Sequence, residues 1–234
     1  MSTFRRQSAA LSLFGNYTLG FARGDTDGPT SFAATPGDWA AERGPSASDV
    51  RHRFTTGGNF KSPLGLVWSP LVVATSGRPF NIITGRDENG DGLFTKRPGV
   101  VAAGGDGSAT VRETALGRFD LAPAAGTARL GRNSGRGSPQ FIFNLGVGRV
   151  WRLGTSKDGA GGMLGGLAGA GAEKPYRLHL SVYVENVFNH PNFDSPVGNL
   201  SSPRFGRPTR TSGSFRGGRD LGNRQVELQL CFSF

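Results

Sequence analysis

The last eleven residues of the chain, RQVELQLCFSF, alternate between polar and apolar side chains without a break. One parity holds Val226, Leu228, Leu230, Phe232 and Phe234, and the other holds Gln225, Glu227, Gln229, Cys231 and Ser233. Successive side chains of a β-strand point to opposite faces, so a period of two predicts a strand with one apolar and one polar face. A fold built on such strands must cover each apolar face with protein or with lipid.

Further segments show the same period, and a helical period is hard to find anywhere. They span residues 8–22, 51–61, 65–76, 141–151 and 176–189. We therefore expect an all-β chain of about six strands. The start, MSTFRRQSAALSLFG, has two arginines before a short apolar run but no small-residue cleavage site, so we interpret it as a strand and not as an export signal. Pro70 lies inside the third segment and predicts a bulge there.

Long and short connections alternate along the chain. The long ones span residues 23–50, 77–140 and 189–223, whereas only SPL separates the second strand from the third. The connection between the fourth and fifth strands, with the Gly-rich stretch Gly159 to Gly171, is intermediate in length. Long loops at one end and short turns at the other are typical of a transmembrane β-barrel. A soluble sandwich also alternates, but it has no reason to place every long loop at the same end.

The side chains also favour a barrel over a sandwich. Charged residues on the polar parity, such as Lys61, Arg177 and Glu227, are costly in a sandwich core but cost little in a wet lumen. Aromatic residues on the apolar parity fall near one end of their strands, as in an interfacial girdle. These are Phe60, Trp151, Tyr176 and Phe234. We therefore predict an incomplete antiparallel transmembrane β-barrel with long extracellular loops, surrounded by lipid of the bacterial outer membrane.

Composition argues against several other classes. No apolar run approaches the roughly 20 residues of a membrane helix, and a single cysteine excludes an internal disulfide. The net charge is +10, but the arginines are scattered through loops, so we expect solvated basic loops and no nucleic-acid partner. The three histidines lack metal spacing and no catalytic motif accompanies them. We therefore expect no enzyme; a barrel hydrolase using His190 beside Asp194 and Ser195 is the alternative.

Several stretches together resemble the C-terminal barrel region of TonB-dependent outer-membrane receptors, in particular the carboxypeptidase-regulatory-like-domain type found in Acidobacteria. The stretches are DVRHRF (49–54), SGRPFNIITGRDENGDGLFTKRPG (76–99), RNSGRG (132–137), VYVENVFNHPNF (182–193), LSSPRFGRP (200–208) and the terminal RQVELQLCFSF. The resemblance implies that residues 1–234 form the C-terminal part of a barrel of about twenty-two strands. The plug domain of such a receptor is absent from these residues.

In a receptor of this family the ligand binds to extracellular loops and plug, and the TonB complex acts on the plug. The resemblance thus implies that this chain contributes lumen wall and loops for uptake of an unidentified small molecule, glycan or peptide, and meets TonB only through the absent plug. Alone it should be inactive, because a barrel must close to leave no strand edge in lipid. A stable membrane form would need self-association or the missing strands. The alternative function is a surface-exposed binding or adhesion module without transport.

The segment DENGDG, residues 87–92, is the best candidate for a metal site. Asp87, Asn89 and Asp91 have the alternate spacing of a calcium loop, and Gly92 stands at its turn position. The twelfth position holds Pro98, where an EF-hand needs a bidentate Glu. Weak structural calcium binding and an ordinary Asx turn both stay open, and no other cofactor is expected.

Two further groups are candidates for the rim of the barrel. Asp49, Arg51, His52 and Arg53 cluster where a strand begins, and we expect salt bridges there that set the register. The loop aromatics either line a ligand surface or pack the loops against one another. They are Phe80, Phe94, Phe193, Phe205 and Phe215.

Overall fold

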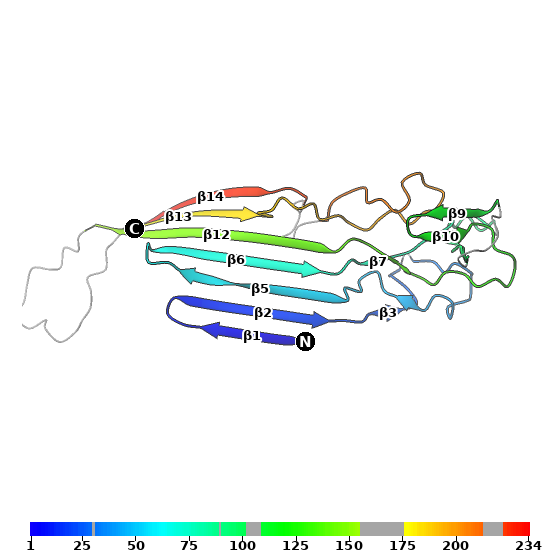
Figure 1. Ribbon diagram of the computed structural model, residues 1–234, viewed down its shortest axis with the longest axis horizontal. Helices are drawn as coiled ribbons and strands as arrows, with labels where there is room; N and C mark the ends of the chain where they lie inside the picture. The colour runs from blue at the N-terminus through cyan, green and yellow to red at the C-terminus, as the bar shows by residue number, and fades with distance from the viewer. Residues whose placement is uncertain (30, 89, 102–108, 155–175, 213–221) are drawn as a thin grey trace, which may run out of the picture.

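The largest element of the structure is a seven-stranded antiparallel sheet, and the loops at one end of this sheet fold into a cap (Figure 1). The computed structural model describes all residues except 30, 89, 102–108, 155–175 and 213–221. The strand order follows the chain, β1-β2-β5-β6-β12-β13-β14. The bounds are β1 Ser2–Gln7, β2 Leu11–Leu19, β5 His52–Lys61, β6 Leu66–Thr75, β12 Gln140–Leu153, β13 Tyr176–Glu185 and β14 Gln225–Ser233. In this described part of the chain no helix is long and apolar enough to cross a membrane.

The ladders bring the apolar parity of every strand to one face of the sheet. Leu230 of β14 pairs with Leu180 of β13. In the middle of the sheet, Trp68 of β6 pairs with Val147 of β12 on one side and with Phe60 of β5 on the other. Directly paired residues lie on the same face, so these side chains form one continuous surface, the apolar face. Leu230 is 66% exposed in the isolated chain, so this face requires lipid to cover it. The polar parity forms the opposite face, the luminal face.

The structure differs from the sequence prediction at the first strand. The prediction treated residues 8–22 as one strand and counted about six strands in all. The chain instead turns at Ser8, whose N–H donates to the Leu11 carbonyl at 2.6 Å. This turn separates β1 from β2, and the sheet gains a seventh strand. Phe4 of β1 pairs with Gly15 of β2, and its ring occupies the space where a Cβ of Gly15 would stand. The glycine therefore lets the aromatic ring lie on the strand beside it.

The bulge predicted at Pro70 is wrong. Pro70 pairs with Leu145 in an unbroken ladder between β6 and β12. On the other side of β6, no pair is formed between Gly57↔Leu71 and Phe60↔Trp68, but the register is the same before and after this gap. Proline has no N–H to donate, so one interrupted stretch of ladder accommodates it without an extra residue.

All the long connections leave the sheet at the same end, as the sequence predicted. They join β2 to β5, β6 to β12 and β13 to β14 at what we call the loop end (Figure 1). The opposite turn end holds the hairpins between β1 and β2 and between β5 and β6. In the second hairpin Gly65 has a φ of +74° and donates its N–H to the Ser62 carbonyl at 3.0 Å. The Gly-rich stretch Gly159 to Gly171 lies outside the described residues.

The cap is built from short strand pairs at the loop end. β3 (Arg23–Gly24) pairs with β4 (Gly44–Pro45), β7 (Pro79–Phe80) pairs with β11 (Gly135–Arg136), and β10 (Gly117–Asp120) lies between β8 (Gly99–Val100) and β9 (Val111–Thr114). A small hydrophobic core of Phe80, Ile82, Phe119 and Leu200 joins β7 to β10. The sequence left open whether residues 85–140 are ordered; the described residues of this range include β8, β9, β10 and β11.

Candidate functional site

Asp49 ties three segments together where β5 meets the cap. Its carboxylate is only 2% exposed. It accepts hydrogen bonds from Arg136 Nη2 at 2.9 Å, from Arg51 Nη2 at 3.4 Å and from the Ala22 N–H at 3.0 Å. Burial raises the pKa of this carboxyl, but the hydrogen bonds and the charge of Arg51 outweigh it, so the pKa is lowered. A salt bridge of the predicted cluster is thus present between Asp49 and Arg51, and its role in setting the register stays a prediction.

Other parts of that predicted cluster are placed differently. His52 Nδ1 lies 2.8 Å from the Tyr17 hydroxyl. The partner of this histidine is therefore a tyrosine of β2 and not a carboxylate. Arg136 is the partner that sequence analysis missed, because it lies 87 residues from Asp49. Strand periodicity does not say which loops meet. The one available signal was that Arg136 belongs to RNSGRG, a stretch on which the resemblance rested.

Glu42 and Arg97 form a buried ion pair inside the cap. Arg97 Nη1 donates to Glu42 Oε2 at 2.8 Å and Arg97 Nη2 donates to Glu42 Oε1 at 2.7 Å, with the two side chains 5% and 4% exposed. The Ala34 N–H also donates to Glu42 Oε1, at 2.8 Å. Burial raises the pKa of the Glu42 carboxyl, but the hydrogen bonds from Arg97 and Ala34 outweigh it and the pKa is lowered. This pair joins the first long loop to the second.

Arg132 and Asn133 fix the β3–β4 hairpin from inside the cap. Arg132 Nη1 donates to the Gly24 carbonyl at 2.8 Å, and Arg132 Nη2 lies 2.5 Å from Asp27 Oδ2. Asn133 Nδ2 donates to the same carboxylate oxygen at 2.7 Å and to the Pro45 carbonyl at 2.8 Å. Both strands of the hairpin are thereby held by side chains more than 80 residues further along the chain.

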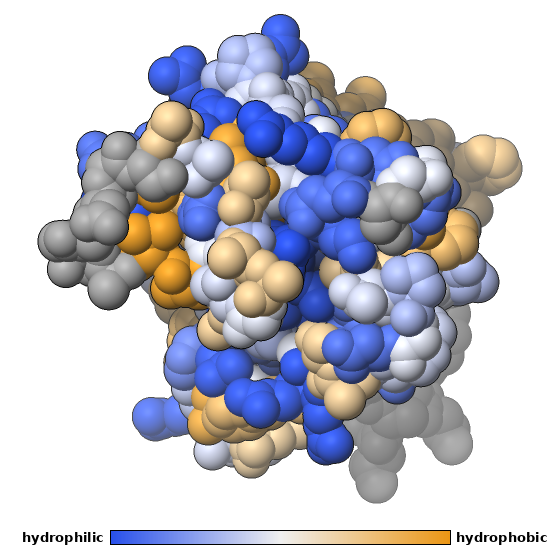
Figure 2. Space-filling model, turned by 90° about the vertical axis from the view of Figure 1, so that its right-hand side faces the viewer, coloured by the Kyte–Doolittle hydropathy of each residue, from blue (hydrophilic) through white to orange (hydrophobic). Residues whose placement is uncertain are grey.

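Beside β3 lies a groove, the cap groove, with a volume of about 400 Å³. It is lined by Arg23, Gly24, Asp25, Trp39, Ala40 and Arg43. Trp39 is 53% exposed. An exposed indole can stack on a flat ring, and guanidinium groups near it can pair with acidic groups. Viewed from the loop end, the surface of the cap is mostly hydrophilic with smaller apolar patches (Figure 2). The cap groove is therefore a candidate first contact for a ligand.

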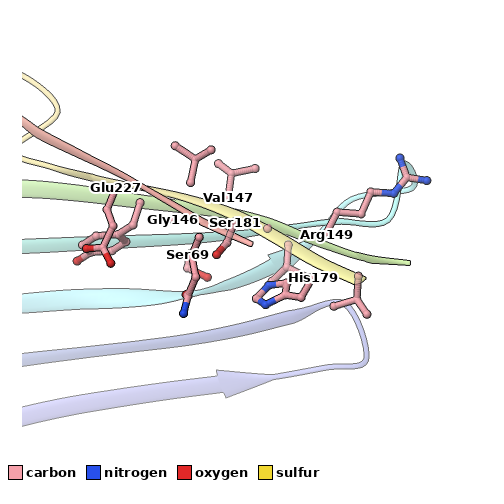
Figure 3. A pocket seen from close by; sticks show the side chains of 13 residues that line it. Ser69, Gly146, Val147, Arg149, His179, Ser181 and Glu227 are labelled. Atoms are coloured by element: carbon pink, nitrogen blue, oxygen red, sulfur yellow. The ribbon is translucent and has the colours of Figure 1, made fainter. Parts of the chain in front are cut away.

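A second hollow lies along the sheet, with a volume of about 410 Å³, and we call it the luminal groove (Figure 3). Its polar lining comes from β6, β12, β13 and β14 and comprises Ser69, Arg149, His179, Ser181, Tyr183, Glu227 and Gln229. Gly146 and Gly148 of β12 keep it open; a Cβ at Gly148 would lie 3.1 Å from His179 Nε2. These groups supply hydrogen-bond donors and acceptors along the luminal face.

The predicted calcium loop lies only partly in the described chain, since Asn89 is outside it. The Asp87 carboxylate accepts hydrogen bonds from the N–H groups of Gly90, Asp91 and Gly92, at 2.8, 3.2 and 3.0 Å. No group of three His, Cys, Asp or Glu side chains among the described residues is placed to hold a metal ion. The Asx turn of this loop is made by Asp91, whose Oδ1 accepts from the Leu93 N–H at 2.8 Å, and calcium binding stays a prediction.

The loop aromatics fall into two groups. Phe80 belongs to the cap core, and Phe205 packs against it with its ring edge-on to Phe119, at a centroid separation of 6.1 Å. Phe94 and Phe193 are exposed, and Phe215 lies outside the described residues. Packing is thus observed for the first pair, while ligand contact by the exposed pair stays a prediction.

In the alternative hydrolase site the Asp194 carboxylate is paired with an arginine. Arg210 Nε donates to Asp194 Oδ2 at 2.6 Å, and the Ser195 N–H donates to Asp194 Oδ1 at 2.7 Å. Burial raises the pKa of Asp194, but the hydrogen bonds from Ser195 and Arg210 outweigh it, so the pKa is lowered. The backbone N–H of His190 donates to Asn186 Oδ1 at 3.0 Å. The Asp194 carboxylate is therefore the partner of the Arg210 guanidinium and of the Ser195 backbone N–H.

A sheet with one continuous apolar face, a polar opposite face and all its long loops at one end is the architecture of an outer-membrane β-barrel protein. The family described as "Outer membrane beta barrel domain" matches residues 1–158, which include β1 to β12 and the cap up to β11. The chain belongs to this family, and its place is the bacterial outer membrane. No curated protein and no solved structure matches the chain.

Proposed function

We propose that the chain is a wall and loop segment of a TonB-dependent receptor, which takes up an unidentified small molecule, glycan or peptide and does no chemistry on it. The proposal rests mainly on the positions of the cap groove and the luminal groove. The cap groove lies beside β3 at the loop end, where a ligand would arrive, and the luminal groove lies along the polar face, where a ligand or a plug would pass.

The construction of the cap supports a ligand-binding role. Gly24 and Glu42 are held from inside by Arg132 and Arg97, so the residues next to them in the chain, which line the cap groove, project from a fixed backbone. A site that is fixed before the ligand arrives loses less conformational freedom on binding. The family match and the membrane location fit this role but also fit a barrel that binds without transport.

The test asks which polypeptide carries this chain in the cell and whether TonB touches it. An antibody raised against residues 1–234 is used on outer membranes of the source bacterium after cross-linking with formaldehyde. We expect it to detect a longer polypeptide that includes a plug and forms an adduct with TonB. A surface-exposed polypeptide without a plug and without a TonB adduct would replace this proposal with the adhesion module.

A further inference from the structure

The arginines of the cap groove differ from those inside the cap. Arg97 and Arg132 are buried, and each of them pairs with a carboxylate. Arg23 and Arg43 are exposed, and among the described residues neither of their side chains has a hydrogen-bond or ion-pair partner. The fold therefore leaves two guanidinium groups in the groove available to an anion from outside.

The cap groove also contains one acid and one aromatic ring. Asp25 is exposed, and its carboxylate too has no hydrogen-bond partner within the described part of the chain. The Trp39 indole makes no ring contact with any other described side chain. The two arginines and the one aspartate together give the groove a net charge of +1, so it suits a ligand that carries negative charge.

The backbone that carries these side chains is fixed. The Glu42 N–H donates to the Trp39 carbonyl at 3.1 Å and closes a turn in the segment that lines the groove. The Glu42 side chain is held in turn by Arg97. In β4, a Cβ on Gly44 would lie 2.6 Å from the Arg132 carbonyl oxygen, so this strand rests directly on the interior of the cap. A groove that is fixed in this way loses little conformational freedom when it binds a ligand.

The groups of the groove restrict the chemistry of that ligand. An indole offers a flat apolar surface to another ring or to the C–H face of a sugar, and a guanidinium group pairs with a carboxylate through two parallel hydrogen bonds. The Asp25 carboxylate accepts hydrogen bonds but repels an acid, so it favours a ligand that brings hydroxyl groups as well. A ring, an acid group and hydroxyl groups together describe an acidic sugar. An aromatic acid without hydroxyl groups lacks the third of these features.

We propose that the cap groove binds an acidic sugar, with the sugar ring on Trp39, its carboxylate paired with Arg23 and Arg43, and a hydroxyl group donating to Asp25. The proposal rests on the proposed function in taking the cap groove as the place where the ligand first binds, and it names the chemical class of that ligand. Neutral sugars and cationic peptides would leave the two arginines without a partner.

The first test compares a charged and an uncharged form of one probe. Trigalacturonate has a carboxylate on each sugar ring, and its methyl ester has the same rings without the charges. The full chain is refolded in detergent micelles, its β-sheet content is checked by circular dichroism, and binding is measured by isothermal titration calorimetry. We expect the ester to bind about tenfold more weakly, because charge-assisted hydrogen bonds to arginine are lost. Equal affinities, or no binding of either probe to the folded chain, would overturn the proposal.

Substitutions locate the binding in the groove. Arg43→Gln should weaken the binding of trigalacturonate about tenfold, and Trp39→Leu should weaken the binding of both the acid and the ester. The control is Arg86→Gln, which removes an exposed arginine of the cap that does not line the groove and should change neither affinity. If Arg86→Gln weakens binding as much as Arg43→Gln does, the chain attracts anions only through its net charge and the proposal fails.

Asp25 distinguishes a sugar from other acids. The second probe, 2-naphthoate, has a flat ring and an acid group but no hydroxyl group. Asp25→Ala should strengthen the binding of 2-naphthoate, because a repulsive charge is removed, and should weaken that of trigalacturonate, because a hydroxyl group loses its acceptor. Stronger binding of both probes would overturn the acidic sugar in favour of an aromatic acid. These affinities do not involve TonB, so their failure is distinguishable from a failure of the receptor proposal.

Discussion

The sheet and the cap differ in the kinds of side chain that they bury. Of the buried hydrophobic residues in the described chain, the sheet contributes only Val73 and Ile142, whereas the cap has a core around Phe80 and Leu200 and buried charged groups such as Arg97. The sheet is held by its ladder and leaves its apolar side chains for lipid, while the cap folds as a small water-exposed protein does. One chain therefore contains two regions with different solvent requirements, and changes that harm one should spare the other.

Acid should have the largest effect, because it acts on several cap carboxyls together. Asp27, Glu42, Asp49 and Asp194 all have lowered pKa values. A lowered pKa in the folded state stabilises the fold fully above the ordinary values of about 4, and this stabilisation is lost as pH falls through the folded values. We expect the cap to become sensitive to protease below about pH 4 while the β-sheet signal in circular dichroism persists. Cap protection that survives to about pH 2 would contradict this, as would its loss already near pH 6.

Among single substitutions, Arg97→Ala should destabilise the cap most. It leaves the Glu42 carboxylate buried without its ion-pair partner, a loss of about 3–5 kcal/mol. The quantity to measure is the urea dependence of Trp39 fluorescence, since this indole lies on the adjoining surface. Arg86→Ala removes an exposed arginine from the same loop and should change the midpoint little. If the two variants unfold at the same urea concentration, the Arg97 pair contributes nothing to cap stability.

Unlike the cap, the sheet should be destabilised in the membrane by a charged side chain on its apolar face. Leu230→Arg places a guanidinium group on the apolar face at a cost of about 2–4 kcal/mol near the middle of the bilayer. Gln229→Arg places the same group on the luminal face and should be tolerated. Both residues are exposed in the isolated chain, so only lipid can tell the variants apart. The fraction of protein extracted from outer-membrane vesicles by alkaline carbonate measures this, and equal extraction would mean that the faces are assigned wrongly.

A smaller contrast comes from two glycines that face aromatic rings. In the cap, a Cβ on Gly135 would lie 2.6 Å from Phe80, which is buried and cannot move aside. In the sheet, a Cβ on Gly15 would collide with Phe4, which is half exposed and free to turn outward. We expect Gly135→Ala to cost about 1–3 kcal/mol and Gly15→Ala clearly less. Gly131→Ala, where no atom lies within 4 Å of the added methyl group, is the cap control, and all three can be compared by thermal melting.

The sheet could be predicted almost completely from the sequence, and the cap hardly at all. The parity of residues such as Phe60 and Leu230 places them on the correct face, because strand geometry relates neighbours directly, whereas the uniformly apolar segment 65–76 left its facing open. The errors, at Ser8 and Pro70, are local: a tight turn and one interrupted stretch of ladder. The residues of the apolar face could thus be predicted without any knowledge of the tertiary structure.

The cap depends on contacts that no local pattern contains. Arg132 meets Gly24 across 108 residues, and Arg97 meets Glu42 across 55. The residues themselves are ordinary loop arginines in a basic chain, and the sequence analysis treated such arginines as solvated. What distinguishes them is burial beside a carboxylate, which is a property of the assembled loops. Glu42 and Arg97 are therefore found only when the loops are seen together.

The ion pairs of the cap also restrict how this end of the molecule can move. Asp49 is bonded to Arg136 of β11, to Arg51 just before β5 and to Ala22 just after β2, and Glu42 is bonded to the second loop. To swing away alone, either loop would have to expose a charged group that is now paired and buried. A gate made from this cap would therefore open as one lid hinged on the sheet and not as separate flaps.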